Sequence, residues 1–401
     1  MSGAPRERKL SRRKKLLTVA TVFGVLLGAY AWIAFTDISP IDDSDLALTY
    51  PDVSEDENAY TWLARAHDAE WNDDRARALE CTLRAAECRV LAPPSDPSQA
   101  KHFGLGNYGQ EFEDAIARED YEACWQMFGA ARTLTRLHSE HPEFFSTLSF
   151  LRFCDRQTSR AIRLATRDPS KVRLRHWLQV VEAPLLVPDW EARMHLREYH
   201  WFREGLFRDS GRGLVGPQWF LRRNRTAARL ADVARRRLDG EVHPDRLSAT
   251  PSFTQTVFWW LGGNVTGESY AHAFARLPSW IAGPLAQKAL AKSALLEATI
   301  AVRIFFLDHG RYPERLEELV PGLSSRRLTD PFDPAGAPLR WDPNRRVLWS
   351  VGRDGIDDGG VATGPSGRGT ATEARQPAAA ADLTLVFPES PVEPTPPPRS
   401  P

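Results

Sequence analysis

The feature that most constrains the fold is a helical stretch near the C-terminal end of the chain that stops abruptly. Its apolar residues recur at the spacing of one helix face with charged residues between them, which predicts an amphipathic helix that packs one side on a sheet. Gly310 can adopt a positive φ and Pro313 cannot continue a helix, so the helix should end there. The apolar positions are Leu295, Ala298, Val302, Phe305 and Phe306, and the charged ones are Lys292, Glu297 and Arg303.

Two short strands should follow this helix. Turn-forming residues fill the stretch from Asp330 to Gly336, and residues 339–342 and 347–351 then have the pattern of a strand pair. Side chains alternate between the two faces of a strand. The face of the second strand that we expect to cover the helix consists of Val347, Trp349 and Val351.

This region resembles the C-terminal globular part of the major pseudopilin of type II secretion systems. Three motifs in the family's order carry the resemblance: the helix running into Asp308–Pro313, the turn from Asp330 to Pro338, and the glycine-rich acidic loop from Ser350 to Gly360. Asp382-Leu383 is similar to the start of the family's last short strand. The resemblance implies a long helix laid on a small antiparallel sheet over residues 285–388, and a role in or beside the secretion machinery.

The acidic loop of that module is the candidate metal site. In the pseudopilin family the loop before the last strand binds calcium, and the resemblance implies Asp354 and Asp382 as matched ligands, with Asp357 and Asp358 as local substitutes. The residues point the same way, because carboxylates separated by Gly355 can curl so that their oxygens converge on a hard cation. The alternative is an acidic turn that only faces solvent.

Three departures from the family pattern favour an accessory role over that of a pilus subunit. We find nothing like the family's cleavable leader, which ends in glycine before a phenylalanine and a glutamate. A large helical region separates the N-terminal apolar segment from the pseudopilin-like module, whereas the family has one continuous helix. Residues 361–381 form a long insertion rich in Gly, Ala and Thr.

The N-terminal residues predict a membrane anchor. Residues 1–15 hold seven basic side chains and one acidic side chain, a net of +6, and residues 16–35 are uncharged. A helix of that length, at about 1.5 Å per residue, spans the roughly 30 Å core of a bilayer. The positive flank should stay in the cytoplasm, so we expect a single-pass inner-membrane protein with its bulk in the periplasm. A cleaved signal peptide is the alternative, because Ala29-Tyr30-Ala31 forms an A-x-A pattern.

Charge and cysteine content limit the partners. The whole chain has a net charge of +0 and residues 1–15 hold a positive excess, so the remainder is acidic, which argues against nucleic acid as a partner. We expect contacts with the inner membrane and with secretion-system or other envelope proteins.

The state of the cysteines stays open between disulfides across helices and buried free thiols. The cysteines are Cys81, Cys88, Cys124 and Cys154.

The middle of the chain has a mostly helical pattern. Residues 36–284 should form a helical domain, as a bundle or an irregular solenoid, and residues 389–401 a disordered proline-rich tail. Candidate chemical sites in the helical region are weak.

Two histidine clusters illustrate this. His138 and His141 are three residues apart, and Pro142 follows His141 directly, which is typical of a helix end with capping side chains and not of a zinc site. His195, Glu198 and His200 should lie on a solvent-exposed helix surface.

The sequence therefore predicts a mainly α-helical protein with a small α+β C-terminal module and an N-terminal transmembrane helix. We expect a non-enzymatic envelope protein, an accessory or interaction component related to type II secretion with a calcium-stabilised module. The alternatives are an anchored periplasmic hydrolase, and a sensor that binds a small ligand between its helices.

Overall fold

The computed structural model describes residues 15, 17–29, 36–47, 53–92, 106–140, 144–207, 221–239, 264–319, 328–360 and 383–388, together with 254 and 259. The chain forms two compact units: residues 1–48 with 195–278 make unit 1, and residues 49–194 with 279–401 make unit 2. The C-terminal module thus shares a unit with helices that the sequence assigns to another domain. The predicted insertion at 361–381 and the tail at 389–401 lie outside the described residues.

The structure overturns the predicted membrane anchor. No helix in the described part of the chain is long and apolar enough to cross a membrane. The predicted transmembrane helix at 16–35 is therefore wrong, and so are the inner-membrane and periplasmic locations that depended on it.

A layer of helices makes up the first part of unit 2. Side chains set several helix starts, because Asn58, Asp74 and Ser170 each accept a hydrogen bond from a backbone N–H of the first turn. The elements are η2 (Glu55–Glu57), α2 (Ala59–Trp71), α3 (Arg75–Glu87), α4 (Gly106–Ala117), α5 (Tyr121–Glu140), α6 (Phe144–Ala165) and α7 (Lys171–Glu182).

The C-terminal module combines the end of α12 (Val265–His309) with a three-stranded sheet. Gly310 has a φ of 68°, and its N–H bonds to the carbonyl of Phe306, so the predicted end of the helix is confirmed. The sheet is antiparallel in the order β1-β2-β3, with β2 in the centre. Its strands are β1 (Arg340–Asp342), β2 (Val347–Ser350) and β3 (Leu383–Val386), and η5 (Leu316–Leu319) precedes them.

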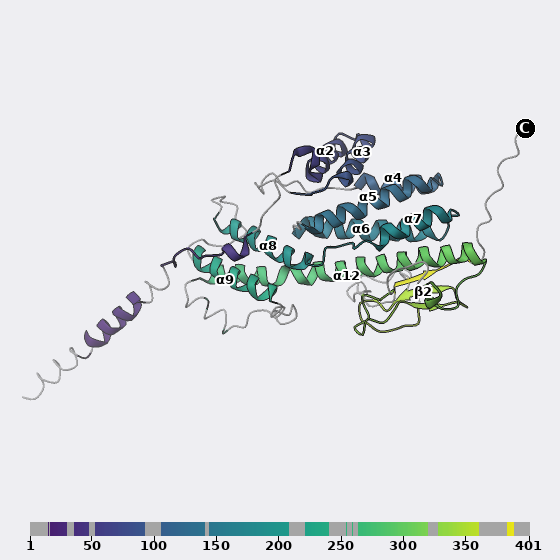
Figure 1. The fold of residues 1–401 in the computed structure, drawn as a ribbon. Helices are drawn as coiled ribbons and strands as arrows, with labels where there is room; N and C mark the ends of the chain where they lie inside the picture. The colour runs from purple at the N-terminus through teal and green to yellow at the C-terminus, as the bar shows by residue number, and fades with distance from the viewer. Residues whose placement is uncertain are drawn as a thin grey trace, which may run out of the picture. The chain divides into compact units, whose positions relative to one another are not determined.

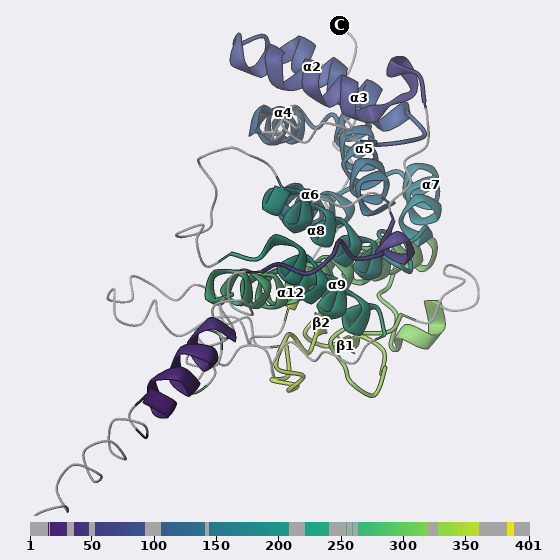
Figure 2. The same ribbon diagram turned by 90° about the vertical axis from the view of Figure 1, so that its left-hand side faces the viewer.

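The C-terminal half of α12 is buried on two sides. Helices α4 to α7 cover one side and the sheet covers the other, as two perpendicular views show (Figures 1 and 2). Leu296 and Ile300 are 0% exposed, and they belong to one core that also contains Trp125 of α5 and Leu348 of β2. The sheet and the helical layer are thus joined through α12.

A buried aspartate binds several polar groups at this junction. Asp168 is 0% exposed and accepts hydrogen bonds from Trp125 Nε1 at 2.9 Å and from Arg173 at 2.8 and 2.8 Å. Its carbonyl oxygen accepts one from Arg303 Nε of α12 at 3.3 Å. The predicted solvent-facing polar side of α12 is wrong, since Glu297 and Arg303 are both buried there. Burial lowers the pKa of Arg303.

The face of β2 that meets α12 also differs from the prediction. Leu348 is 0% exposed and belongs to the α12 core, with its cross-strand neighbours Trp341 and Leu385 packed against that core. Trp349 lies on the other face, where a Cβ added to Gly360 would come within 2.8 Å of its ring. Alternation predicted the wrong face because all of β2 is buried, the inner face by α12 and the outer face by the loop that follows.

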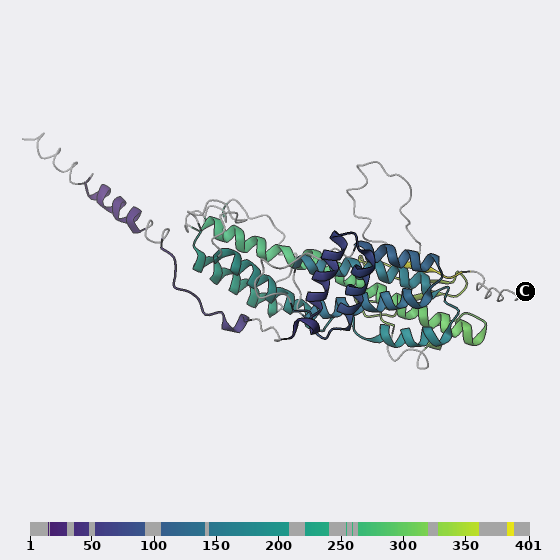
Figure 3. The same cartoon turned by 90° about the horizontal axis from the view of Figure 1, so that it is seen from above.

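The described core of unit 1 combines α9, parts of α8 and α12, and one short N-terminal segment. α9 (Arg223–Leu238) and the first part of α12 lie side by side (Figure 3), and Leu230 and Phe274 are buried there together with Tyr199 of α8 (Trp190–Phe207). The segment at 36–47, which contains the 3-10 helix η1 (Ser44–Leu46), packs against the same core.

A histidine, a glutamate and an arginine are buried next to one another in the described part of unit 1. Glu198 lies 3.7 Å from Nδ1 of His195 and 3.6 Å from Nη1 of Arg237, and within the described residues neither of its carboxylate oxygens has a hydrogen-bond partner. Burial raises the pKa of Glu198 well above its ordinary value, and it lowers the pKa of His195 to about 3 and that of Arg237 to about 10. The predicted exposed surface is wrong here, because α9 covers this side of α8.

Acid should destabilise unit 1 through His195. Its folded-state pKa of about 3 lies below the ordinary 6.5, so between these values the unfolded chain binds a proton that the folded chain does not. We expect this residue alone to lower the free energy of unfolding by about 1 kcal/mol between about pH 6.5 and 5.5. Urea unfolding of the wild type and His195→Gln at both pH values measures the difference. An H195Q variant that loses stability as steeply as the wild type would contradict it.

Candidate interaction site in the C-terminal module

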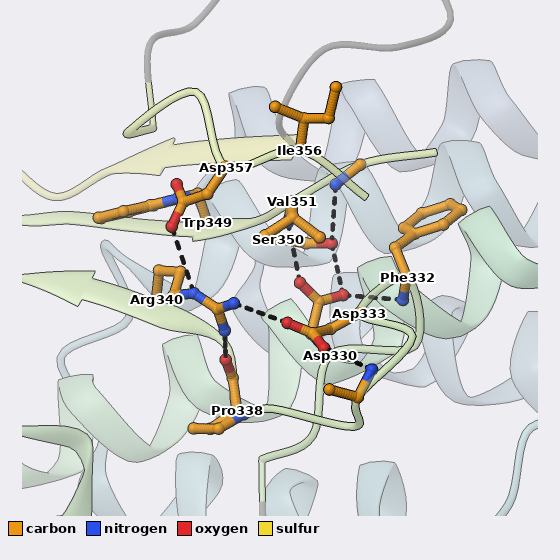
Figure 4. Close-up of polar contacts among 12 residues, drawn as sticks. Asp330, Phe332, Asp333, Pro338, Arg340, Trp349, Ser350, Val351, Ile356 and Asp357 are labelled. Carbon is orange, nitrogen blue, oxygen red and sulfur yellow. Dashed lines mark hydrogen bonds and ion pairs between the residues drawn. The ribbon is translucent and has the colours of Figure 1, made fainter. Parts of the chain in front are cut away.

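Asp330 holds the turn that leads into the sheet (Figure 4). Its side chain is buried and accepts three hydrogen bonds, from Phe332 N at 2.9 Å, Ser350 Oγ at 2.7 Å and Val351 N at 2.8 Å. The first bond closes a turn within its own segment. The other two fasten that turn to the end of β2, so one carboxylate fixes two segments that are distant in the sequence.

Arg340 on β1 gathers acidic side chains from two loops (Figure 4). Its guanidinium pairs with Asp333 at 2.6 Å and Asp357 at 3.3 Å, and it also donates to the carbonyl oxygen of Pro338. The hydrogen bond from Arg340 lowers the pKa of Asp333, and the same bond raises the pKa of Arg340. The charged forms of both groups are favoured, and Arg340 ties the turn at 330–336 to the loop at 352–360.

The loop at 352–360 is fixed at its base and exposed at its tip. Trp349 Nε1 donates to Asp357 Oδ1 at 2.9 Å, and Arg345 donates to the carbonyl oxygens of residues 359 and 360 at 2.7 and 3.1 Å. Burial raises the pKa of Asp357, but the bonds from Trp349, the loop backbone and Arg340 outweigh it and leave that pKa below its ordinary value. Ile356 at the tip is 60% exposed, and Figure 4 shows it pointing away from the polar network.

Three of the four predicted calcium ligands, Asp354, Asp357 and Asp358, lie in the described part of the loop. Asp354 accepts a hydrogen bond from the backbone of its own loop, Asp357 is held by the side chains described above, and Asp358 is exposed. The fourth predicted ligand, Asp382, lies outside the described residues. Within the described ranges, no group of three or more His, Cys, Asp or Glu side chains could hold a metal ion. Arg340 places a positive charge beside Asp357, and the calcium site stays a prediction.

Arg340 and Asp333 organise the site, although the sequence analysis did not single them out. Arg340 stands opposite Trp349 in the pairing of β1 with β2, so it shares the face that carries the loop. Alternation along β1 places Arg340 and Asp342 on one side and Trp341 on the other, and this was the available signal. The acidic partners could not be assigned from it, because they come from a turn and a loop whose paths are set by tertiary contacts.

The other candidate residues have structural roles. His138 Nε2 hydrogen-bonds to Thr147 Oγ1 at 2.9 Å, and its ring stacks on Phe150 at 4.5 Å. α5 is described as far as Glu140, and His141 lies outside the described residues. All four cysteines are free thiols, which decides between the two alternatives left open by the sequence.

A cavity of about 270 Å³ lies in unit 2 beside α12. Arg132 lines it and donates to Ser293 Oγ at 2.8 Å, to the carbonyl of Val181 at 2.6 Å, and to the carbonyl of Ala183. Since these bonds join α5, α12 and the segment after α7, this arginine fixes the helices in place.

Comparison of the chain with protein-family models, with curated proteins and with solved structures finds no match. The pseudopilin resemblance therefore rests on the motifs between residues 308 and 360, and on the position that each takes in the module.

Replacing Asp330 with Asn should destabilise the C-terminal module. The change puts an NH₂ group among backbone and hydroxyl donors and removes a buried charged acceptor, at a cost of about 2–3 kcal/mol. Urea unfolding followed by tryptophan fluorescence reports it, because Trp341 and Trp349 lie in the sheet. Asp358→Asn removes the same charge from an exposed loop position and should change stability by less than about 0.5 kcal/mol. Equal stability of the two variants would show that Asp330 does not fix the turn.

Proposed function

We propose that the chain is a non-enzymatic interaction protein whose C-terminal module docks on a partner through the loop at 352–360, as an accessory component related to type II secretion. The observation that carries the proposal is that this loop is fixed at its base while its tip is exposed. Ordering a binding loop in advance removes part of the entropy cost of association.

The chemistry of the tip indicates the kind of surface it fits. Ile356 offers an apolar side chain, and the carboxylates of Asp354 and Asp358 beside it are exposed. Gly355 next to the tip has a φ of 68°, a conformation that few residues other than glycine adopt. A complementary partner has a small apolar pocket with basic side chains at its rim.

The link to secretion rests on what the shared motifs do in this module. Tyr312 donates from its hydroxyl group to the carbonyl of Pro388 at 3.2 Å, and its ring packs against Phe387. The carbonyl of Pro313 accepts from Trp341 Nε1 at 2.9 Å. The signature after α12 therefore locks the helix end to β1 and to the residues after β3, which supports a pseudopilin-like module.

Crosslinking from the loop tip tests the proposal in cells that make the protein. A photoreactive residue replacing Ile356 should crosslink to secretion-system components, whereas one replacing Val172, which is 82% exposed on α7, should not. A variant that also carries Arg340→Met should lose these crosslinks, because the loop loses its anchor. Arg353→Met removes the same charge from an exposed position in the loop and should keep them.

The outcomes separate the parts of the proposal. Crosslinks at Ile356 to proteins outside the secretion machinery would support a docking loop and overturn the link to secretion. Equal labelling from positions 356 and 172 would overturn the docking loop itself.

Thermal unfolding tests whether the C-terminal module binds calcium. Since Arg340 and Trp349 already hold Asp357, we expect the full chain to melt at the same temperature in excess calcium and in excess chelator. A higher melting temperature with calcium, lost in Asp354→Asn, would instead support the cation that the resemblance implies. Magnesium at the same concentration controls for ionic strength.

A further inference from the structure

Residues 36–47, called the strap below, lie on α8 and α9 of unit 1 (Figure 1). At one end of the strap, the carboxylate of Asp37 accepts hydrogen bonds from the backbone N–H groups of Asn224 at 2.8 Å and Arg225 at 3.0 Å. These are first-turn donors of α9, a helix whose N-cap residue makes no side-chain capping bond. The strap thus supplies the cap and places a negative charge at the positive end of the helix dipole.

Two arginines hold the other end of the strap. Arg203 of α8 pairs with Asp43 at 2.6 Å, and Arg235 of α9 binds Asp45 through Nε and Nη2, both at 2.7 Å. The hydroxyl group of Tyr199 also donates to Asp43. Bidentate arginine–carboxylate pairs are the geometrically specific ones. An Asp-X-Asp spacing on the strap therefore matches arginines that stand on two different helices.

Leu46 is the apolar anchor of the strap. It is 1% exposed and packs in the core that contains Phe202 and Leu230, and His200 Nε2 lies 2.6 Å from its carbonyl oxygen. A fully buried side chain surrounded by contacts that exclude water is a feature of residues that contribute strongly to binding.

The strap contacts α8 and α9 as a bound peptide would. Its described contacts are a helix cap, ion pairs and an apolar anchor, and it forms no strand ladder with unit 1. The binding groups stand on helices whose positions are fixed by their own core. Arginine clusters that receive acidic segments are a recurrent mode of peptide recognition.

We propose that the α8–α9 surface of unit 1 is a receptor groove for acidic peptides and that the strap is its resident competitor. The ligand is an acidic segment with two carboxylates separated by one residue, the second followed directly by an aliphatic side chain. Because the strap is part of the same chain, it competes at an effective concentration of about millimolar order. A partner enters only when the strap is displaced.

The ion pairs that hold the strap can be weakened from outside. The side chains of Arg235 and Asp45 are 41% and 54% exposed, so salt screens this pair. The guanidinium of Arg235 holds the pKa of Asp45 below its ordinary value. Raised ionic strength should therefore weaken this pair and favour a competitor.

Peptide binding in trans tests the proposal on the full chain. The probe is a fluorescent synthetic peptide with the sequence of residues 36–47. Asp43→Asn with Asp45→Asn should bind it at least about tenfold more tightly than the wild type, because the variant's own strap competes poorly. Asp42→Asn is the matched control, since the Asp42 carboxylate bonds to Ser44 of the strap itself, and it should behave as the wild type. A probe with Asp in place of its leucine should bind at least about tenfold more weakly.

Two results would overturn the proposal. One is a variant with unchanged helical circular dichroism that binds the probe no better than the wild type. The other is equal binding of the leucine-substituted probe. A charge exchange decides the matter if the double variant does not fold: Arg235→Asp in the protein should make it prefer a probe that carries Arg in place of Asp45. If the variant still prefers the original probe, Arg235 does not recognise the peptide.

Discussion

Burial of α12 on both sides between about residues 295 and 305 is the constraint on which unit 2 depends. Each fully buried Leu or Ile side chain contributes about 1.5–3 kcal/mol, and both the helical layer and the sheet draw on this same stretch. The cost of this arrangement falls on Arg303, because a buried guanidinium needs an acceptor. The carbonyl of Asp168 supplies an acceptor for Arg303 Nε while the Asp168 carboxylate binds Trp125 and Arg173, and Nη1 of Arg303 has no hydrogen-bond partner among the described residues. The buried hydrogen bonds around Asp168 are therefore a consequence of burying α12 on both sides.

In the C-terminal site, Asp330 stabilises the fold, whereas Arg340 fixes the position of a loop. Asp330 is buried and satisfies three donors, so its loss leaves them unpaired in the interior. The pairs that Arg340 makes are partly exposed, and such pairs contribute little to the free energy of folding. Their value lies in fixing the loop at 352–360 against the sheet. A loop fixed by weak contacts at its base can keep its shape without stabilising the fold.

The sequence predicted correctly those features that depend on residues close together in the chain. Gly310 and Pro313 predicted the end of α12, and the strand pair around residues 343–346 follows from turn residues and alternation. The errors concern burial by segments that are distant in the sequence. Glu198 and Arg303 read as solvent-facing because nothing near them in the chain shows that α9 or the α4–α7 layer will cover them. The choice between Leu348 and Trp349 as the inner residue fails for the same reason, since a strand covered on both faces loses its alternating signal.

The strap and the loop at 352–360 use the same chemistry with different consequences. In both, arginines on regular elements hold acidic residues of an irregular segment. The loop follows directly on β2, where Asp330 accepts a hydrogen bond from Val351 N; breaking the Arg340 pairs broadens its conformations but leaves it beside the sheet. The strap meets unit 1 through side-chain, cap and anchor contacts. Because no ladder holds the strap, displacing it breaks the helix cap, the ion pairs and the Leu46 contact but no strand pairing. The strap therefore suits exchange with a competing segment, whereas the loop stays beside the sheet and presents its tip.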